Sequence, residues 1–168
     1  IAALVHDPLL LVLDEPLSGF DPVNVELILS EMKELKENGK TIILSTHNMR
    51  SVDEICDRAS LIHESKKVAE DTIWNLREQH NQGEYLVRFK GNIIGFANAL
   101  WTDFELLGHE EIGENRFLAK LKMRGESTMN ELIRALVGKV EIELIEKKLP
   151  SMQEVFVDII TGKEETHA

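Results

Sequence analysis

The sequence predicts a mixed α/β chain, in which residues 1–80 form a parallel sheet with helices and residues 81–168 form a small α+β domain. The apolar run Leu9–Leu13 is typical of a strand that a parallel sheet buries on both faces. A helical pattern follows it and leads to a second short apolar strand at residues 41–45. The polar stretch His80–Glu84 then separates this pattern from shorter strands and capped helices, which predicts the domain boundary.

Local signals define the elements of the first half. Asp21 and Pro22 predict a helix start, because Asp caps free N–H groups and Pro fits the first helical position. Apolar residues recur at helical spacing up to Gly39, a good terminator, so the order strand–helix–strand predicts a parallel crossover unit. Asn48 is expected to cap a short helix. After that helix we expect a strand at 58–65, its hairpin return at 66–72 and a helix from Thr72.

The second half predicts a βαββαβ order with one further helix, typical of a ferredoxin-like, split-βαβ domain. The expected strands lie at 85–90, near 101–107, at 116–123 and at 140–149, and the expected helices at 92–100, 127–138 and 151–162.

Two of these helices have the spacing of a capping box, in which an N-cap hydroxyl and an acid three residues later satisfy each other's backbone N–H groups. The pairs are Thr128 with Glu131 and Ser151 with Glu154. Glycines at 138 and 162 are expected to end the two helices.

Composition excludes several classes of protein. The net charge is -11 and there is no strongly basic block, so we expect no binding to nucleic acid by counterion release. The single cysteine, Cys56, excludes an internal disulfide framework and fits a reducing compartment. No apolar run approaches the roughly 20 residues that span a bilayer, and there is no signal-peptide pattern. Membrane association is therefore expected to go through a partner.

Two acids follow the first strand directly. In open parallel sheets, ligands bind outside the carboxyl ends of the strands, where Asp14 and Glu15 are expected. Two adjacent carboxylates resist burial unless a cation is present, and Mg²⁺ prefers one or two carboxylates with water and phosphate oxygens. Asp14 is therefore a candidate metal ligand, and Glu15 could hold a water or take its proton. The alternative is a strand end with solvated acids.

His47 follows the second strand in the sequence STHN. Because parallel strands end at the same edge of a sheet, we expect Asp14, Glu15 and His47 to face one rim.

The stretches LLLVLDEP, SGFDP and STHNM, in this order and spacing, resemble the Walker B strand, the D-loop and the switch-histidine loop of ATP-binding-cassette (ABC) ATPases. The resemblance covers roughly residues 1–78 and implies the partial fold of a P-loop NTPase. It implies that Asp14 holds Mg²⁺ through water, that Glu15 activates the attacking water and that His47 contacts the γ-phosphate of ATP.

The second of these stretches implies a partner subunit. Ser18, Gly19 and Asp21 would form a D-loop that faces the other subunit of an ATP-sandwich dimer, a homodimer or a heterodimer. Phe20 replaces the usual Leu, a mild departure.

The family's phosphate-binding loop, G-x-x-x-x-G-K-[ST], is missing. The triplet Gly39-Lys40-Thr41 does not supply it, because Glu34 stands where the first Gly should be and the triplet leads from a helix into a strand. The chain begins at Ile1 without a methionine, so we interpret it as a fragment whose loop and signature motif lie upstream. We expect the fragment alone to be inactive and to bind ATP weakly, and we expect it to associate through its uncovered sheet edge.

The stretch KLPSMQEVFVDIITG resembles the closing segment of ABC ATPases that work with ABC-2-type permeases. The resemblance implies an ATPase subunit that uses ATP and Mg²⁺, powers export through a separate integral-membrane permease and lies on the cytoplasmic face of the cell membrane. Two alternatives stay open: a soluble ABC ATPase outside transport, and a non-enzymatic dimerisation or regulatory module in residues 81–168.

Overall fold

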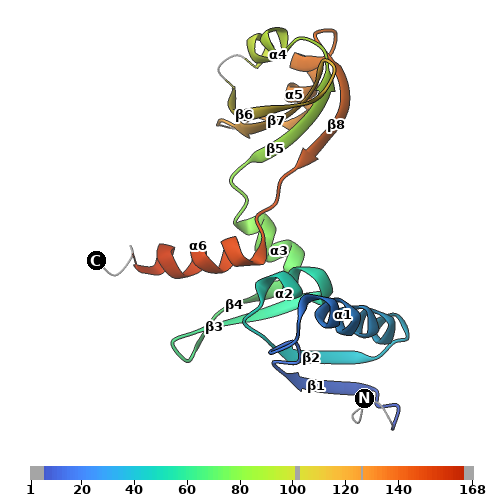
Figure 1. The fold of residues 1–168 in the computed structure, drawn as a ribbon. Coiled ribbons are helices and arrows are strands. Elements are labelled where there is room, and N and C mark those ends of the chain that lie inside the picture. Colours follow the sequence, from blue (N-terminus) through green and yellow to red (C-terminus); the bar gives the residue numbers. More distant parts are fainter. Residues whose placement is uncertain (1–5, 101–102, 126, 165–168) are drawn as a thin grey trace. The chain divides into compact units, whose positions relative to one another are not determined.

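The computed structural model describes residues 6–100, 103–125 and 127–164, and the chain divides into two compact units (Figure 1). Unit 1 combines Ile1–Arg77 with Ser151–Ala168, and unit 2 is Glu78–Pro150. The described part of the chain contains no helix long and apolar enough to cross a membrane.

The first part of unit 1 is a parallel crossover. Strand β1 (Leu10–Asp14) pairs in parallel with β2 (Thr41–Ser45), and α1 (Pro22–Glu37) connects them. The side chain of Asp21 accepts hydrogen bonds from the first helical N–H groups, and Gly39, with φ +80°, follows the last turn. The predicted start and end of this helix are confirmed.

Helix α1 covers one face of the β1–β2 pair. Its buried residues Leu29 and Met32 pack in a cluster that also contains Leu13 and Leu44 from the two strands. Alternate strand residues point to the other face, which remains uncovered in the described structure; they include Leu10, Val12 and Ile43.

The rest of unit 1 consists of a short helix, an antiparallel hairpin and two further helices. These elements are α2 (Met49–Ile55), β3 (Arg58–His63), β4 (Lys66–Thr72), α3 (Ile73–Gln79) and α6 (Met152–Glu164). Their shared core holds Val52 of α2, Leu61 of β3, Leu76 of α3 and Val155 of α6. Among the described residues, β2 pairs only with β1 and β3 only with β4, so unit 1 has two separate two-stranded sheets.

Unit 2 has the predicted order βαββαβ. Its elements are β5 (Glu84–Lys90), α4 (Ile93–Ala99), β6 (Phe104–Gly113), β7 (Arg116–Met123), α5 (Met129–Leu136) and β8 (Glu141–Lys147). The sheet order is β6-β7-β5-β8 with every neighbouring pair antiparallel, so the ferredoxin-like prediction is confirmed.

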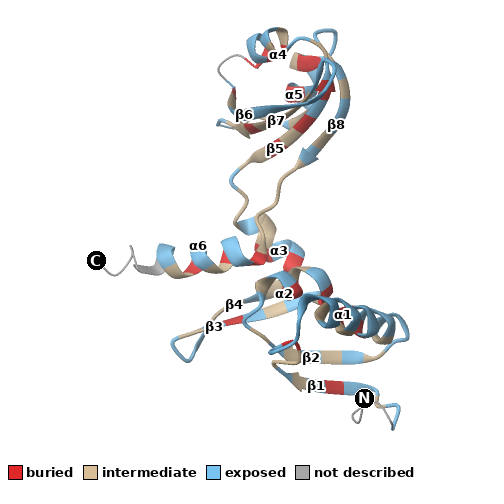
Figure 2. Cartoon of the chain, in the orientation of Figure 1, coloured by how far each residue is buried: buried red, intermediate tan, exposed pale blue. Residues whose placement is uncertain are grey.

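The core of unit 2 lies between this sheet and its two helices. Phe89 of β5 stacks on Phe96 of α4 with ring centroids 4.0 Å apart, and Leu132 of α5 is fully buried in the same cluster. Figure 2 shows buried segments on the sheet and on both helices of this unit.

The ends of several elements differ from the sequence predictions. The strand expected near 101–107 runs from Phe104 to Gly113, and residues 101–102 lie outside the described residues. The capping box of Ser151 and Glu154 is present, but the prediction that Gly162 ends α6 is wrong. Gly162 does not adopt the left-handed conformation that ends a helix, and α6 continues to Glu164.

The division into units also differs from the boundary expected at residues 80–84. The break falls after Arg77, and the stretch from Ser151 onward belongs to unit 1. The physical reason is burial: Met152 and Val155 of α6 are fully buried in the core that α2, α3 and β3 form.

Candidate functional site

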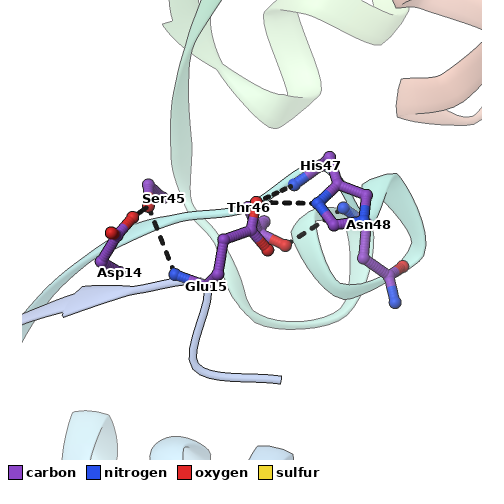
Figure 3. Close-up of polar contacts among 6 residues, drawn as sticks. All are labelled: Asp14, Glu15, Ser45, Thr46, His47 and Asn48. Atoms are coloured by element: carbon purple, nitrogen blue, oxygen red, sulfur yellow. Dashed lines mark hydrogen bonds and ion pairs between the residues drawn. The ribbon is translucent and has the colours of Figure 1, made fainter. Parts of the chain in front are cut away.

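The candidate site lies where β1 and β2 end. The parallel ladder pairs Asp14 with Ser45, and the backbone N–H of Glu15 donates to the Ser45 carbonyl at 3.0 Å. Figure 3 shows Asp14 beside Ser45, and Glu15 turned toward His47 in the loop after β2. The structure therefore brings the two acids and the imidazole to one edge of the sheet.

Ser45 links both acids. Its hydroxyl donates to Asp14 Oδ1, and its Oγ also accepts from the Glu15 N–H at 3.3 Å. Sequence reasoning missed Ser45. The signal that could have found it is the strand pairing, because the last residues of two in-register parallel strands must lie side by side.

Glu15 adopts an unusual backbone conformation, with φ of 43° in the left-handed region. Its Oε1 accepts from the His47 backbone N–H at 3.1 Å and lies 2.8 Å from His47 Nδ1. An ionised carboxylate only accepts hydrogen bonds, so this contact requires the proton on Nδ1. The Glu15 and His47 side chains are 38% and 82% exposed, so solvent or a ligand can reach the pair.

The loop that carries His47 has its own hydrogen bonds. Thr46 Oγ1 accepts from the Asn48 N–H at 3.1 Å, and Asn48 Oδ1 accepts from the Ser51 N–H at 3.3 Å. Asn48 is the N-cap of α2, as predicted. His47 therefore lies between a strand end and a capped helix.

Ser18, Gly19 and Asp21 lie in the turn between β1 and α1. The Ser18 N–H donates to the Glu15 carbonyl at 3.1 Å, and Gly19 has a φ of +81°. Hydrogen bonds from the backbone and side chain of Asn24 lower the pKa of Asp21 below its usual value. In the described chain Asp21 acts as a helix cap, and the D-loop role of the three residues stays a prediction.

The donors at this edge are oxygen atoms, which suit Mg²⁺. No group of three or more His, Cys, Asp or Glu side chains among the described residues could hold a metal ion by itself. Mg²⁺ does not require one, since it commonly binds one or two carboxylates and completes its shell with water and phosphate oxygens. Asp14, with the Ser45 hydroxyl beside it, fits that requirement.

A groove of about 1120 Å³ adjoins the site. Strands β2 and β3 line it with helices α2 and α6, and His47 and Ser45 stand at one part of its wall. Lys40, of the triplet Gly39-Lys40-Thr41, also lines the groove. Its Nζ forms an ion pair with Asp7 Oδ1 at 2.6 Å.

Comparison with known proteins identifies the family. The model of the C-terminal domain of DrrA1-3-like ATP-binding proteins matches residues 72–160, more than half of the chain. The chain belongs to this family. A second model, of the AAA domain, matches residues 1–53.

Curated relatives of this DrrA1-3-like chain are ATP-binding proteins, named either for an ABC transporter or for export. The ABC transporter ATP-binding protein YhaQ of Bacillus subtilis is 29% identical over 94% of the chain and 51% of the relative. The fluoroquinolones export ATP-binding protein of Mycobacterium tuberculosis is 30% identical over 98% of the chain and 47% of the relative. The Nod factor export ATP-binding protein I of a Rhizobium species is 31% identical over 96% and 50%.

The DrrA1-3-like chain thus spans about half the length of the curated relatives it matches. A solved structure of an ATP-binding subunit of an ABC transporter is 34% identical over 44% of this chain and 30% of that chain, with a TM-score of 0.40.

Proposed function

We propose that this chain is part of the ATP-hydrolysing subunit of an ABC transporter, which drives export through a separate membrane permease. Membership of a family of ATP-binding proteins supports the binding of ATP, and two relatives that are named as export ATP-binding proteins support a role in export. Because the relatives are about twice as long, we propose that the active protein is a longer chain that includes residues 1–168.

One observation carries the proposal: the Glu15 carboxylate and the His47 ring meet at the ends of two parallel strands, 2.8 Å apart. A carboxylate held there, partly open to solvent, can take a proton from a water that attacks phosphate. The His47 backbone N–H and ring N–H both donate to the same Glu15 oxygen, which fixes the orientation of the base. The His47 side chain is exposed enough to contact a terminal phosphate.

Asp14 is the proposed metal residue, and the Ser45 hydroxyl orients its carboxylate. A bound Mg²⁺ would supply neutralising charge to the phosphates of ATP. We further propose that the turn with Ser18, Gly19 and Asp21 faces the partner ATPase subunit, and that the subunit works at the cytoplasmic face of the membrane through its permease. The exposure of all three turn residues is compatible with such a contact.

The test is Glu15→Gln in the full-length protein that carries this sequence. Gln keeps an oxygen that can accept from the His47 N–H but cannot take a proton, so we expect ATP turnover to fall by about 10²–10⁴-fold, the usual worth of a general base. ATP binding, measured by equilibrium titration, should be retained.

Glu26→Gln is the matched control, because it makes the same chemical change on an exposed position of α1. Turnover that survives Glu15→Gln at the level of this control would remove Glu15 from the role of base.

A further inference from the structure

A single carboxylate on α2 contacts both sides of the break in unit 1. The backbone N–H of Met152 donates to Asp53 Oδ2 at 3.1 Å and lies 3.3 Å from Oδ1. Arg77 Nη1 lies 3.8 Å from Asp53 Oδ1. Arg77 is the last residue of unit 1 before unit 2 begins, and Ser151 is the first residue after unit 2 ends. Asp53 thus contacts unit 1 near both points where the chain leaves it and returns to it.

This contact is sheltered from solvent and supported by apolar packing. The Asp53 and Arg77 side chains are 22% and 31% exposed, so solvent screens their attraction less than at a fully exposed pair. A carboxylate at the first N–H groups of α6 also complements the positive end of that helix. Beneath it, Met152 is fully buried in the core that contains Val52 of α2.

Asp53 lies on the short helix that directly follows the loop with His47. Helix α2 has 7 residues and begins after the N-cap Asn48, so Asp53 lies little more than one turn from the loop that carries His47. The backbone bond from the Val52 N–H to the Asn48 carbonyl, 3.3 Å, spans that turn. Because Asp53 follows Val52 directly, a shift of α2 at Asp53 is expected to move the first turn of the helix, which Asn48 caps.

We propose that Asp53 is a positioning residue for His47. It holds α2 against the ends of α3 and α6, and this keeps the His47 ring within reach of Glu15. The inference rests on the proposed function for the importance of His47, but its test uses no nucleotide. A failure of ATP turnover and a failure of this inference can therefore be told apart.

The test is nitrogen-detected NMR of the His47 ring in the 168-residue chain. The wild type should show the proton on Nδ1, the atom that faces Glu15. In Asp53→Ala we expect this signature to be lost and the α2 and α6 amides to exchange at least about fivefold faster, as after the loss of a helix cap. Asp53→Asn keeps an acceptor for the Met152 N–H, so it should restore the wild-type signature.

The control is Glu54→Gln, which changes the next acid of α2, whose partner is Arg50 on the same helix at 3.0 Å. We expect the His47 signature to be unchanged in this variant. A wild-type His47 signature in Asp53→Ala would overturn the proposal.

A measurement on the wild type keeps the proposal testable even where Asp53→Ala does not fold. Native-state hydrogen exchange should show the amide of Cys56, the C-cap of α2 that donates to Val52, opening together with the Val155 amide of α6 as denaturant is added. Opening of α6 at a denaturant concentration that leaves α2 closed would overturn the inference.

Discussion

At the scale of single residues, the site depends on a strained backbone that neighbouring hydrogen bonds hold in place. A non-glycine residue with φ of 43°, such as Glu15, costs on the order of 1–3 kcal/mol. Three contacts oppose that cost: the Glu15 N–H donates to Ser45, and its carboxylate accepts from the His47 backbone and ring. The turn at Glu15 directs its side chain to the loop after β2.

The cap at Asp21 makes the stability of α1 depend on pH. Hydrogen bonds lower the pKa of Asp21 in the folded chain, so its contribution is present above its unfolded pKa, about 4, and is lost as pH falls through the lower folded pKa. Asp21→Asn caps about as well but does not titrate. We expect the melting temperature of the wild type, relative to this variant, to be constant above about pH 5 and to fall below about pH 4.

Thermal unfolding of both proteins between about pH 2 and pH 7 measures this difference. Asp21→Ala is the second reference, because it should be less stable than Asp21→Asn at every pH. A wild-type curve parallel to that of Asp21→Asn through the acid range would contradict the prediction.

The sequence predicted which residues gather at the candidate site where the signals are local. Asp14, Glu15 and His47 lie at or just after the end of a strand whose apolar pattern is visible in the sequence, and Asn48 and Asp21 are caps of neighbouring helices. The hydroxyl bridge of Ser45 depends on the register between two strands 30 residues apart, which no local pattern encodes.

At the scale of elements, helix starts rest on local sequence signals, whereas helix packing depends on contacts between distant residues. Helix starts with short-range signals, such as Thr128 with Glu131, form the capping boxes that their spacing predicts. The sequence did not predict that α6 packs in unit 1. An amphipathic pattern indicates which face of a helix is buried, but not which core buries it. Asp53 binds the first turn of α6, and the apolar residues of α2 and α3 pack against its buried face.

The packing of α6 predicts a local loss of stability on truncation of Met152. Its side chain is 0% exposed, so Met152→Ala should cost about 2–5 kcal/mol through lost burial and the cavity left behind. Hydrogen exchange read residue by residue should show less protection in α2, α3 and α6, and unchanged protection at Val87 in unit 2.

Val157→Ala is the control on the same helix, because Val157 is 52% exposed and its truncation should change stability by no more than about 0.5 kcal/mol. Equal losses at Val87 and in α6 would show that the two units unfold as one, contrary to this prediction.

At the scale of the whole chain, the two units differ in how far their strands join into one sheet. Unit 2 has a four-stranded sheet with a continuous core against its two helices. In unit 1 the described strands form only pairs, and isolated strand pairs are marginal in water. Parallel sheets in proteins have both faces covered, but the face of β1–β2 opposite α1 exposes Leu10 and Val12.

This uncovered face predicts self-association of the 168-residue chain. Val12 and Ile43 are 71% and 55% exposed on neighbouring strands, and the described strands pair with β2 on one edge only, through β1. Light scattering should show the average mass rising with concentration.

Ile43→Lys should reduce the rise, because a charge on an open sheet opposes pairing with another copy. Ile94→Lys, at a residue of unit 2 that is 67% exposed, should not. A wild type that stays monomeric at high concentration would show that the open sheet of unit 1 is stable without a partner.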